Sequence, residues 1–257
     1  MSCAEAAASL PRKDGSVVGG RTAQVRDHSW AVALASRERF GSARSGQFCG
    51  GAVVARRTVL TAAHCLSSQV LGVSRQRVTD LTVISGREDL TRGEGRETSV
   101  ARVWINPGHD PRTHTGDVAV LTLAEPLPGG ALVPAGAGDR AYGPGTEAEV
   151  YGWGDTRGDG SYANRLHAAP VRVLPDEECA RAYPGDGTGA YRAATMLCAG
   201  LPEGGSDACQ GDSGGPLVAR GRLVGLVSWG TGCGERGSPG VYTRISAVLP
   251  LLRAHLE

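Results

Sequence analysis

The chain has 257 residues, of which 27 are basic and 26 are acidic, so its formal net charge at pH 7 is only +1. This near balance, without a basic stripe along the sequence, argues against binding to nucleic acid or to an anionic membrane surface. No apolar run reaches the roughly 18 residues that a membrane-spanning helix needs. The length suits one or two domains with a sizeable hydrophobic core.

The first sixteen residues show no pattern typical of a folded element. Residues 1–16 contain no apolar segment of the length that a signal peptide requires, so no secretion signal is visible. We interpret residues 1–16 as an N-terminal tail or propeptide. The character of the sequence changes at Val17, where it reads Val-Val-Gly-Gly.

Short β-rich runs, divided by Gly, Pro, Asp and Ser, fill most of the remaining chain. This pattern is typical of an all-β sandwich or barrel. Six runs precede residue 130 and six follow it: Ala31–Leu34, Phe48–Val54, Thr58–Ala62, Val78–Ile84, Val100–Ile105 and Val118–Leu123, then Glu149–Trp153, His167–Leu174, Thr195–Gly200, Pro216–Arg220, Arg222–Trp229 and Gly240–Ile245. The Pro- and Gly-rich stretch Glu125–Gly138 between the two sets is suited to a linker.

The last segment, Ser246–Glu257, is predicted to form a short packed helix. Its apolar residues are Val248, Leu249, Leu251, Leu252 and Leu256. Pro250 is compatible with a helix only near the first turn, where a missing N–H costs no intrahelical hydrogen bond.

Three motifs supply a histidine, an aspartate and a serine in the order of a hydrolytic triad. His64 stands in Thr-Ala-Ala-His-Cys, Asp117 opens Asp-Val-Ala-Val-Leu, and Ser213 stands in Gly-Asp-Ser-Gly-Gly-Pro. A serine hydroxyl is a poor nucleophile until a base accepts its proton, and a carboxylate can orient that base. Each residue alone is more simply interpreted as structural, but the three motifs together favour a catalytic site.

From Val17 to about Arg244 the chain resembles the chymotrypsin-like serine proteases of trypsin type. It is similar in pattern to bacterial (actinobacterial) trypsins in its Val-Val-Gly-Gly start, its cysteines and the absence of a basic residue before Val17. The resemblance implies an all-β fold of two six-stranded antiparallel β-barrels, in residues 17–130 and 131–245, with a C-terminal helix in residues 246–257. It also implies an endopeptidase that forms an acyl-enzyme and needs no cofactor or metal.

The resemblance assigns catalytic roles to four residues. Ser213 would attack the scissile carbonyl, His64 would accept and return the proton, and Asp117 would hold the imidazole in the right tautomer. The backbone N–H groups of Gly211 and Ser213 would form the oxyanion hole, in which one donor is typically worth about 2.7–4 kcal/mol.

Substrate selection would depend on Asp207, six residues before the nucleophile. The resemblance places this carboxylate at the bottom of the primary specificity pocket, where it would select Arg and also Lys through charge-assisted hydrogen bonds. Four further positions would bind substrate: Ser228, Trp229 and Gly230 along the edge that pairs with the substrate backbone, and Gly230 together with Gly240 along the pocket walls.

Activation is expected to depend on Val17 and Asp212. In relatives, cleavage before the first of these residues frees an α-amine that pairs with the carboxylate preceding the serine. The match is physically sensible, because a buried carboxylate is costly without a cation. Ser16 precedes the cut here, so a trypsin-like enzyme would not activate itself at this bond. We expect an inactive precursor while residues 1–16 remain attached.

The seven cysteines show no zinc-ligand spacing and predict disulfides, hence an oxidising compartment and a secreted protein. The resemblance implies the pairs Cys49–Cys65, Cys179–Cys198 and Cys209–Cys233 and leaves Cys3 as a free thiol on the tail. It also implies that the loop Gly86–Glu97 could bind calcium. However, Arg87 stands where the first acidic ligand is expected, and a cation there would oppose the metal.

The partners implied are protein or peptide substrates and protein protease inhibitors, acting on a monomer. Two alternatives stay open at this point. One is a protease of the same class with another pocket preference, if Asp207 is misplaced. The other is a catalytically inactive homologue that binds partners through its loops, although such proteins usually lose a triad member and this chain has all three.

Overall fold

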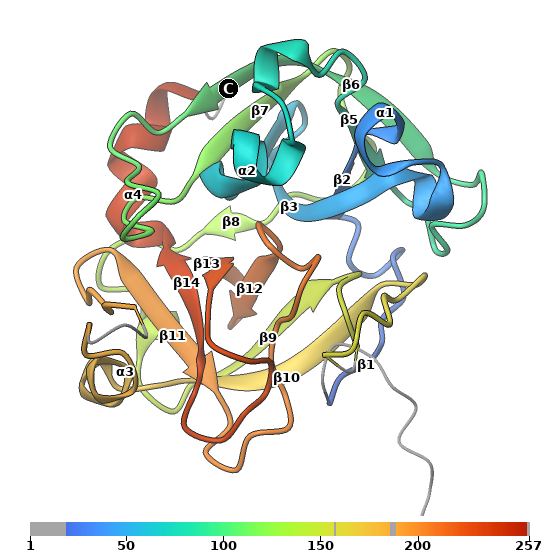
Figure 1. Cartoon of the computed structure of the whole chain (residues 1–257). Coiled ribbons are helices and arrows are strands. Elements are labelled where there is room, and N and C mark those ends of the chain that lie inside the picture. Colours follow the sequence, from blue (N-terminus) through green and yellow to red (C-terminus); the bar gives the residue numbers. More distant parts are fainter. Residues whose placement is uncertain (1–18, 157, 186–188, 256–257) are drawn as a thin grey trace, which may run out of the picture.

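The computed structural model describes residues 19–156, 158–185 and 189–255, which form two β-barrels that lie side by side (Figure 1). The predictions concerning residues 1–16, Cys3 and Val17 lie outside the described residues. The two six-stranded antiparallel barrels and the short C-terminal helix implied by the resemblance are confirmed.

The first barrel is a closed ring in the order β2-β3-β4-β7-β6-β5. Its strands are β2 (Ala31–Ala35), β3 (Gln47–Ala55), β4 (Thr58–Thr61), β5 (Thr82–Ser85), β6 (Arg96–Ile105) and β7 (Ala119–Leu123). Every residue of β2 is buried. Because successive side chains point to opposite faces of a strand, both faces of β2 are therefore covered. Val32 and Leu34 belong to the core of the barrel, whereas its alanines pack in a cluster with Tyr151 and Trp153 of the second barrel.

The second barrel closes in the order β9-β10-β11-β14-β13-β12, since β9 also pairs with β10. Its strands are β9 (Glu147–Gly152), β10 (His167–Val173), β11 (Met196–Gly200), β12 (Pro216–Ala219), β13 (Arg222–Trp229) and β14 (Gly240–Arg244). Two short strands extend it, and neither is predicted from the sequence. β1 (Arg21–Thr22) pairs with β10, and β8 (Val133–Pro134), within the Glu125–Gly138 stretch, lies parallel to β13.

The helices are short and lie on the connections between strands. They are α1 (Arg37–Phe40), α2 (Ser68–Leu71), α3 (Asp176–Ala182) and α4 (Ile245–Leu252), with 3₁₀ helices η1 (Ala43–Gly46), η2 (Ala63–Leu66), η3 (Arg75–Arg77), η4 (Arg140–Tyr142) and η5 (Arg253–His255). Helix α3 is not predicted from the sequence. The first turn of this helix nevertheless holds three acidic residues, which suit the positive end of a helix.

Helix α4 contains Pro250 as the sixth of its eight residues. The expectation that this proline lies near the first turn is therefore wrong. Ile245, Val248 and Leu252 of this helix are buried in a cluster that includes Leu60 of the first barrel and Leu226 of the second. This apolar face stabilises the helix by packing, which offsets the hydrogen bond lost at the proline.

Three disulfides link segments among the described residues, one in the first barrel and two in the second. Cys49–Cys65 joins β3 to η2, Cys179–Cys198 joins α3 to β11, and Cys209–Cys233 joins two loops of the second barrel. These are the same pairs that the resemblance implies. Each closed loop removes conformations from the unfolded chain and typically stabilises the fold by roughly 2–4 kcal/mol.

Arg87 fills the Gly86–Glu97 loop, where the resemblance implies that calcium could bind. Its side chain is 3% exposed and donates hydrogen bonds to the carboxylate of Glu97, the carbonyl oxygen of Glu94 and the hydroxyl of Ser45. Arg37 binds the same carboxylate, and the two guanidinium groups lower the pKa of Glu97 to about 2 against the effect of burial. The residues present therefore do not fit a metal cation, because a guanidinium already neutralises the acidic ligand.

No helix among the described parts of the chain is both long and apolar enough to cross a membrane. The same residues contain no group of three or more His, Cys, Asp or Glu side chains arranged to hold a metal ion.

Replacing Arg87 should destabilise the fold measurably. In Arg87→Met, the hydroxyl of Ser45 and part of Glu97 lose a buried donor, so the free energy of unfolding should fall by about 1–3 kcal/mol in urea denaturation. Arg92→Met is the matched control, because Arg92 is exposed in the same loop and approaches only Asp89, at 3.9 Å. Equal stability of the two variants would contradict the structural role of Arg87.

Candidate active site

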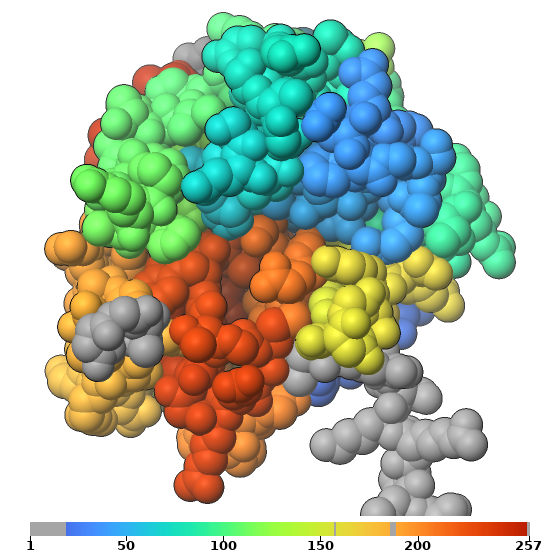
Figure 2. Space-filling model, viewed as in Figure 1, coloured from blue at the N-terminus to red at the C-terminus, as the bar shows by residue number. Residues whose placement is uncertain are grey.

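A cavity of about 260 Å³ opens at the junction of the barrels, and it contains most of the predicted site residues. His64 comes from the first barrel, whereas Asp207, Ser213, Trp229 and Gly240 come from the second. Figure 2 shows this face of the molecule, where the orange and red segments of the second barrel meet the cyan segment of the first.

His64 and Asp117 are brought together by strand pairing in the first barrel. β4 and β7 are antiparallel neighbours in which Thr61 pairs with Ala119. His64 follows the end of β4 on η2, and Asp117 precedes the start of β7, so both lie at the same end of the pair. The register of these strands therefore dictates the contact between imidazole and carboxylate.

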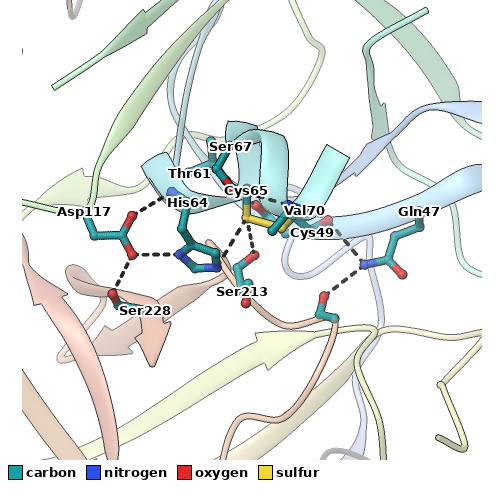
Figure 3. Close-up of a disulfide and its surroundings, with 12 residues drawn as sticks. Gln47, Cys49, Thr61, His64, Cys65, Ser67, Val70, Asp117, Ser213 and Ser228 are labelled. Atoms are coloured by element: carbon teal, nitrogen blue, oxygen red, sulfur yellow. Dashed lines mark hydrogen bonds and ion pairs between the residues drawn. A yellow bond between two sulfur atoms is a disulfide. The ribbon is translucent and has the colours of Figure 1, made fainter. Parts of the chain in front are cut away.

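Two hydrogen bonds fix His64 against Asp117 (Figure 3). The backbone N–H of His64 donates to Oδ1 at 2.9 Å, and its Nδ1 lies 2.8 Å from Oδ2. An ionised carboxylate can only accept, so Nδ1 carries the proton and Nε2 is left as the basic nitrogen. Nε2 is on the side of the ring where Figure 3 shows Ser213.

Asp117 is fully buried and binds the second barrel as well as His64. The hydroxyl of Ser228 on β13 donates to its Oδ2 at 2.5 Å, and the hydroxyl of Thr243 on β14 donates to its backbone carbonyl at 2.7 Å. Burial acts to raise the pKa of Asp117, but the hydrogen bonds from His64 and Ser228 outweigh burial and hold this pKa below its ordinary value. Asp117 is therefore charged at neutral pH.

Ser213 is carried by a turn that only glycine can flank. Gly211 and Gly214 have φ values of 91° and 76°, which side-chain-bearing residues rarely adopt. A Cβ on Gly214 would also lie 2.2 Å from the hydroxyl of Thr61. The carbonyl of Ser213 accepts a hydrogen bond of 2.8 Å from the N–H of Gly50 on β3, which fixes the turn to the first barrel.

The peptide unit between Gln210 and Gly211 has its orientation fixed by a neighbouring loop. The carbonyl of Gln210 accepts a hydrogen bond of 2.6 Å from the N–H of Asp155. In a trans peptide the N–H points opposite to the C=O, so the N–H of Gly211 points away from this loop. Gly211 and Ser213 line a second cavity, of about 340 Å³, which adjoins His64.

Asp207 lies in the cavity with its carboxylate almost fully enclosed, at 3% exposure. Burial raises the pKa of Asp207 to about 7, although hydrogen bonds from the N–H groups of Gly234 and Ala208 act in the opposite direction. A Cβ on Gly240 would lie 2.4 Å from the carboxylate, so this wall has room for no side chain. Among the residues that the structure describes, no Arg or Lys lines this pocket, so its enclosed carboxyl group has no cation beside it.

Trp229 ends β13 beside the cavity and is held by two aromatic rings. Tyr183 contacts it edge-on at 4.8 Å, and His114 stacks against it at 5.8 Å between ring centroids. His109 and His114 stand in no recognisable sequence motif. The structure places His109 Nδ1 4.0 Å from Asp117 Oδ1, and burial lowers the pKa of His114. Only the fold brings these histidines to the site, and no spacing in the sequence indicates it.

Asp212 is completely buried behind the serine. Its carboxylate accepts hydrogen bonds from the N–H groups of Gly154, at 2.7 Å, and Cys209, at 3.0 Å. Burial nevertheless raises the pKa of Asp212 to about 7. A Cβ on Gly152 or Gly154 would overlap this side chain, so two glycines of the β9 end make room for it.

Comparison with known proteins agrees with this architecture. A family model described as Trypsin matches residues 17–252. A trypsin of Saccharopolyspora erythraea is 40% identical over 241 residues, which cover 94% of this chain and 98% of that protein. A trypsin of Sus scrofa is 34% identical over 234 residues, 90% of this chain and 92% of the relative. Transmembrane protease serine 9 of Rattus norvegicus is 40% identical over 249 residues, which cover 91% of this chain but 21% of that longer protein.

Two closed antiparallel barrels with a site at their junction define the chymotrypsin-like class of fold. The chain belongs to the trypsin family of serine proteases. It is therefore a serine endopeptidase, a hydrolase whose substrates are proteins or peptides.

Binding of a small aromatic amidine in the Asp207 pocket should depend on pH. Because the pKa of Asp207 is raised to about 7, the empty pocket is protonated at lower pH and must lose that proton to bind a cation. Benzamidine affinity, measured by calorimetry, should fall by about tenfold per pH unit below that value. Asp207→Asn should bind weakly with no such dependence, and the same pH profile in both proteins would contradict the assignment of this carboxylate.

Proposed function

We propose that this endopeptidase cleaves peptide bonds after Arg, and also after Lys, through a Ser213–His64–Asp117 triad. The observation that carries the proposal is the buried, charged Asp117, which accepts hydrogen bonds from both the backbone and the ring of His64. This arrangement fixes the imidazole tautomer whose free nitrogen can act as a base.

In the proposed mechanism, Nε2 of His64 accepts the hydroxyl proton as Oγ of Ser213 attacks the scissile carbonyl. The N–H groups of Gly211 and Ser213 stabilise the negative charge that develops on the carbonyl oxygen. The imidazolium then gives its proton to the leaving amine as the C–N bond breaks, which leaves an acyl-enzyme on Ser213. Water, deprotonated by His64, releases the acid product and restores the hydroxyl.

The proposed preference for Arg and Lys is supported by the enclosure of Asp207. A guanidinium can bind a carboxylate in two parallel hydrogen bonds, whereas an aromatic side chain would leave the buried charge unpaired at a typical cost of about 3–5 kcal/mol. Gly230 and Gly240 would keep the pocket open, and the backbone of Ser228–Gly230 would pair with the substrate as an added strand.

Proteolytic activation would supply the cation that Asp212 lacks among the described residues. Gly19, the first described residue, packs closely against Gly205, in the loop that leads to Asp207 and Asp212. The α-amine that cleavage before Val17 would free is two residues along the chain from Gly19. A charged amine beside the buried Asp212 would lower the pKa of this carboxyl and order the turn that carries Ser213.

We further propose that the enzyme is secreted and acts as a monomer that protein inhibitors can block through its substrate cleft. The three disulfides support secretion, because such bonds form and persist in oxidising compartments.

A panel of reporter peptides that differ only in the residue before the cut tests these proposals together. Hydrolysis is measured for Arg, Lys, Phe and Ala reporters with the full chain and with protein that begins at Val17. We expect turnover of the Arg and Lys reporters by the trimmed protein alone, because only its Val17 amine can pair with Asp212. Asp207→Ser should remove most of this preference while leaving the triad intact.

Each outcome separates one proposal from the others. Full activity with an intact, sequenced N-terminus would refute activation at Val17. Equal rates for Arg and Phe reporters would refute the role of Asp207. Inactivity of the trimmed protein on every reporter, with its disulfides formed, would count against the triad.

A further inference from the structure

Arg44 has an unusual backbone that directs its side chain from the first barrel to the second. Arg44 and Ser45 have φ values of 48° and 58°, in the left-handed region that side-chain-bearing residues rarely adopt. Two such residues in succession cost of order 1–3 kcal/mol each. Ser45 is held in this conformation by hydrogen bonds with Arg87 and with the carbonyl of Leu90.

The guanidinium of Arg44 binds both ends of one loop of the second barrel. It donates to the carbonyl oxygens of Trp153 and Ala163, the latter at 2.7 Å through Nη2 and 3.1 Å through Nε. It also lies over the ring of Tyr162, at 5.1 Å from the centroid. In Figure 2 the blue segment that carries Arg44 rests on the yellow segment that contains this loop.

The loop between Trp153 and Ala163 is in turn bound to the proposed oxyanion hole. The N–H of Gly154 donates to Asp212, and the N–H of Asp155 donates to the carbonyl of Gln210. The second bond sets the plane of the peptide whose N–H belongs to Gly211. Arg44 binds the carbonyl of Trp153, and the N–H of Asp155 orients the Gln210–Gly211 peptide. Only Gly154 lies between these two residues of the loop.

The first barrel also binds this turn directly. Nε2 of Gln47, three residues after Arg44, donates to the carbonyl of Gly211 at 2.9 Å. The η1 segment is therefore linked to the turn through the loop, and the start of β3 contacts the turn through Gln47. Burial lowers the pKa of Arg44. Burial also raises the pKa of Asp212 to about 7, and the positive charge of Arg44 acts against this rise, so the two groups also interact electrostatically.

We infer that Arg44 is a positioning residue that holds the Trp153–Ala163 loop in place and thereby aims the N–H of Gly211 at the oxyanion. Arg44 does not line the Asp207 cavity, but it lines the neighbouring cavity of about 340 Å³ together with His64, Gly211 and Ser213. This inference rests on the proposed function, because it requires that the hole is used in catalysis.

The test compares Arg44→Met with the wild type, both beginning at Val17, using two inhibitors. Benzamidine needs only the Asp207 pocket, whereas a peptidyl arginine aldehyde forms a hemiacetal whose oxygen occupies the oxyanion hole. Arg44→Met should weaken the aldehyde by about tenfold to a hundredfold, a part of what the loss of one donor costs. Benzamidine binding should change less than about twofold, because its pocket is not touched.

Steady-state kinetics should likewise show an effect on catalysis without an effect on substrate binding. For an Arg reporter, kcat per titrated active site should fall by about tenfold to a hundredfold while KM stays nearly constant, because the interaction is made only in the transition state. Arg44→Lys, which keeps the charge but has fewer donors, should lie between wild type and Arg44→Met. Arg37→Met is the control, since Arg37 lies on the same connection but pairs with Glu97.

The outcomes distinguish this inference from the proposed function. If wild-type protein binds neither inhibitor, the proposed function fails. If wild type binds both and Arg44→Met binds both equally well, the positioning role is wrong. Parallel weakening of both inhibitors would show that Arg44 merely stabilises the fold, and would also overturn the inference.

Discussion

The structure depends on one buried charge, the carboxylate of Asp117, which lies at the junction of the two barrels. The carboxylate of Asp117 is tolerated there because His64 of the first barrel and Ser228 of the second donate to it, and Thr243 of the second barrel donates to the backbone carbonyl of the same residue. Removing one partner of such a buried group typically costs about 3–5 kcal/mol. The same hydrogen bonds therefore fix how the barrels meet and how the imidazole is presented. Stability and chemistry are linked through one carboxylate, which explains why the site lies between the barrels.

Two other buried aspartates show the opposite electrostatic balance. Asp207 and Asp212 have no cation in contact among the described residues, and burial raises the pKa of each to about 7. A carboxyl whose pKa is raised on folding makes the folded state less stable as the pH rises. The loss occurs between about pH 4, the pKa in the unfolded chain, and about pH 7, the pKa in the folded protein. Each site would gain by binding a cation: a substrate side chain at Asp207 and a terminal amine at Asp212. The unfavourable free energy of these two unpaired carboxylates thus supports the proposals for specificity and for activation.

Much of this architecture could be predicted from the sequence because it depends on local patterns. Short β-rich runs divided by Gly, Pro, Asp and Ser indicated the twelve barrel strands, the resemblance implied their arrangement in two barrels, and three motifs identified the segments that carry the candidate triad. What escaped prediction depends on contacts between distant segments. Arg44 resembles any exposed arginine until the fold places the carbonyl of Ala163 beside it, and His114 becomes part of the site only by stacking on Trp229. Pro250 lies beyond the first turn of α4 because the packing of the helix's apolar face offsets the hydrogen bond that the proline removes.

The most direct test of the account is covalent labelling with an organophosphonate, followed by mass spectrometry of the labelled peptides. This reagent reacts with a serine only where a base activates the hydroxyl and an oxyanion hole receives the phosphonyl oxygen. Protein beginning at Val17 should take up one label per chain on Ser213, and His64→Ala should take up almost none. An unlabelled Ser213 in folded, disulfide-bonded protein, or equal labelling of the His64→Ala variant, would contradict the account.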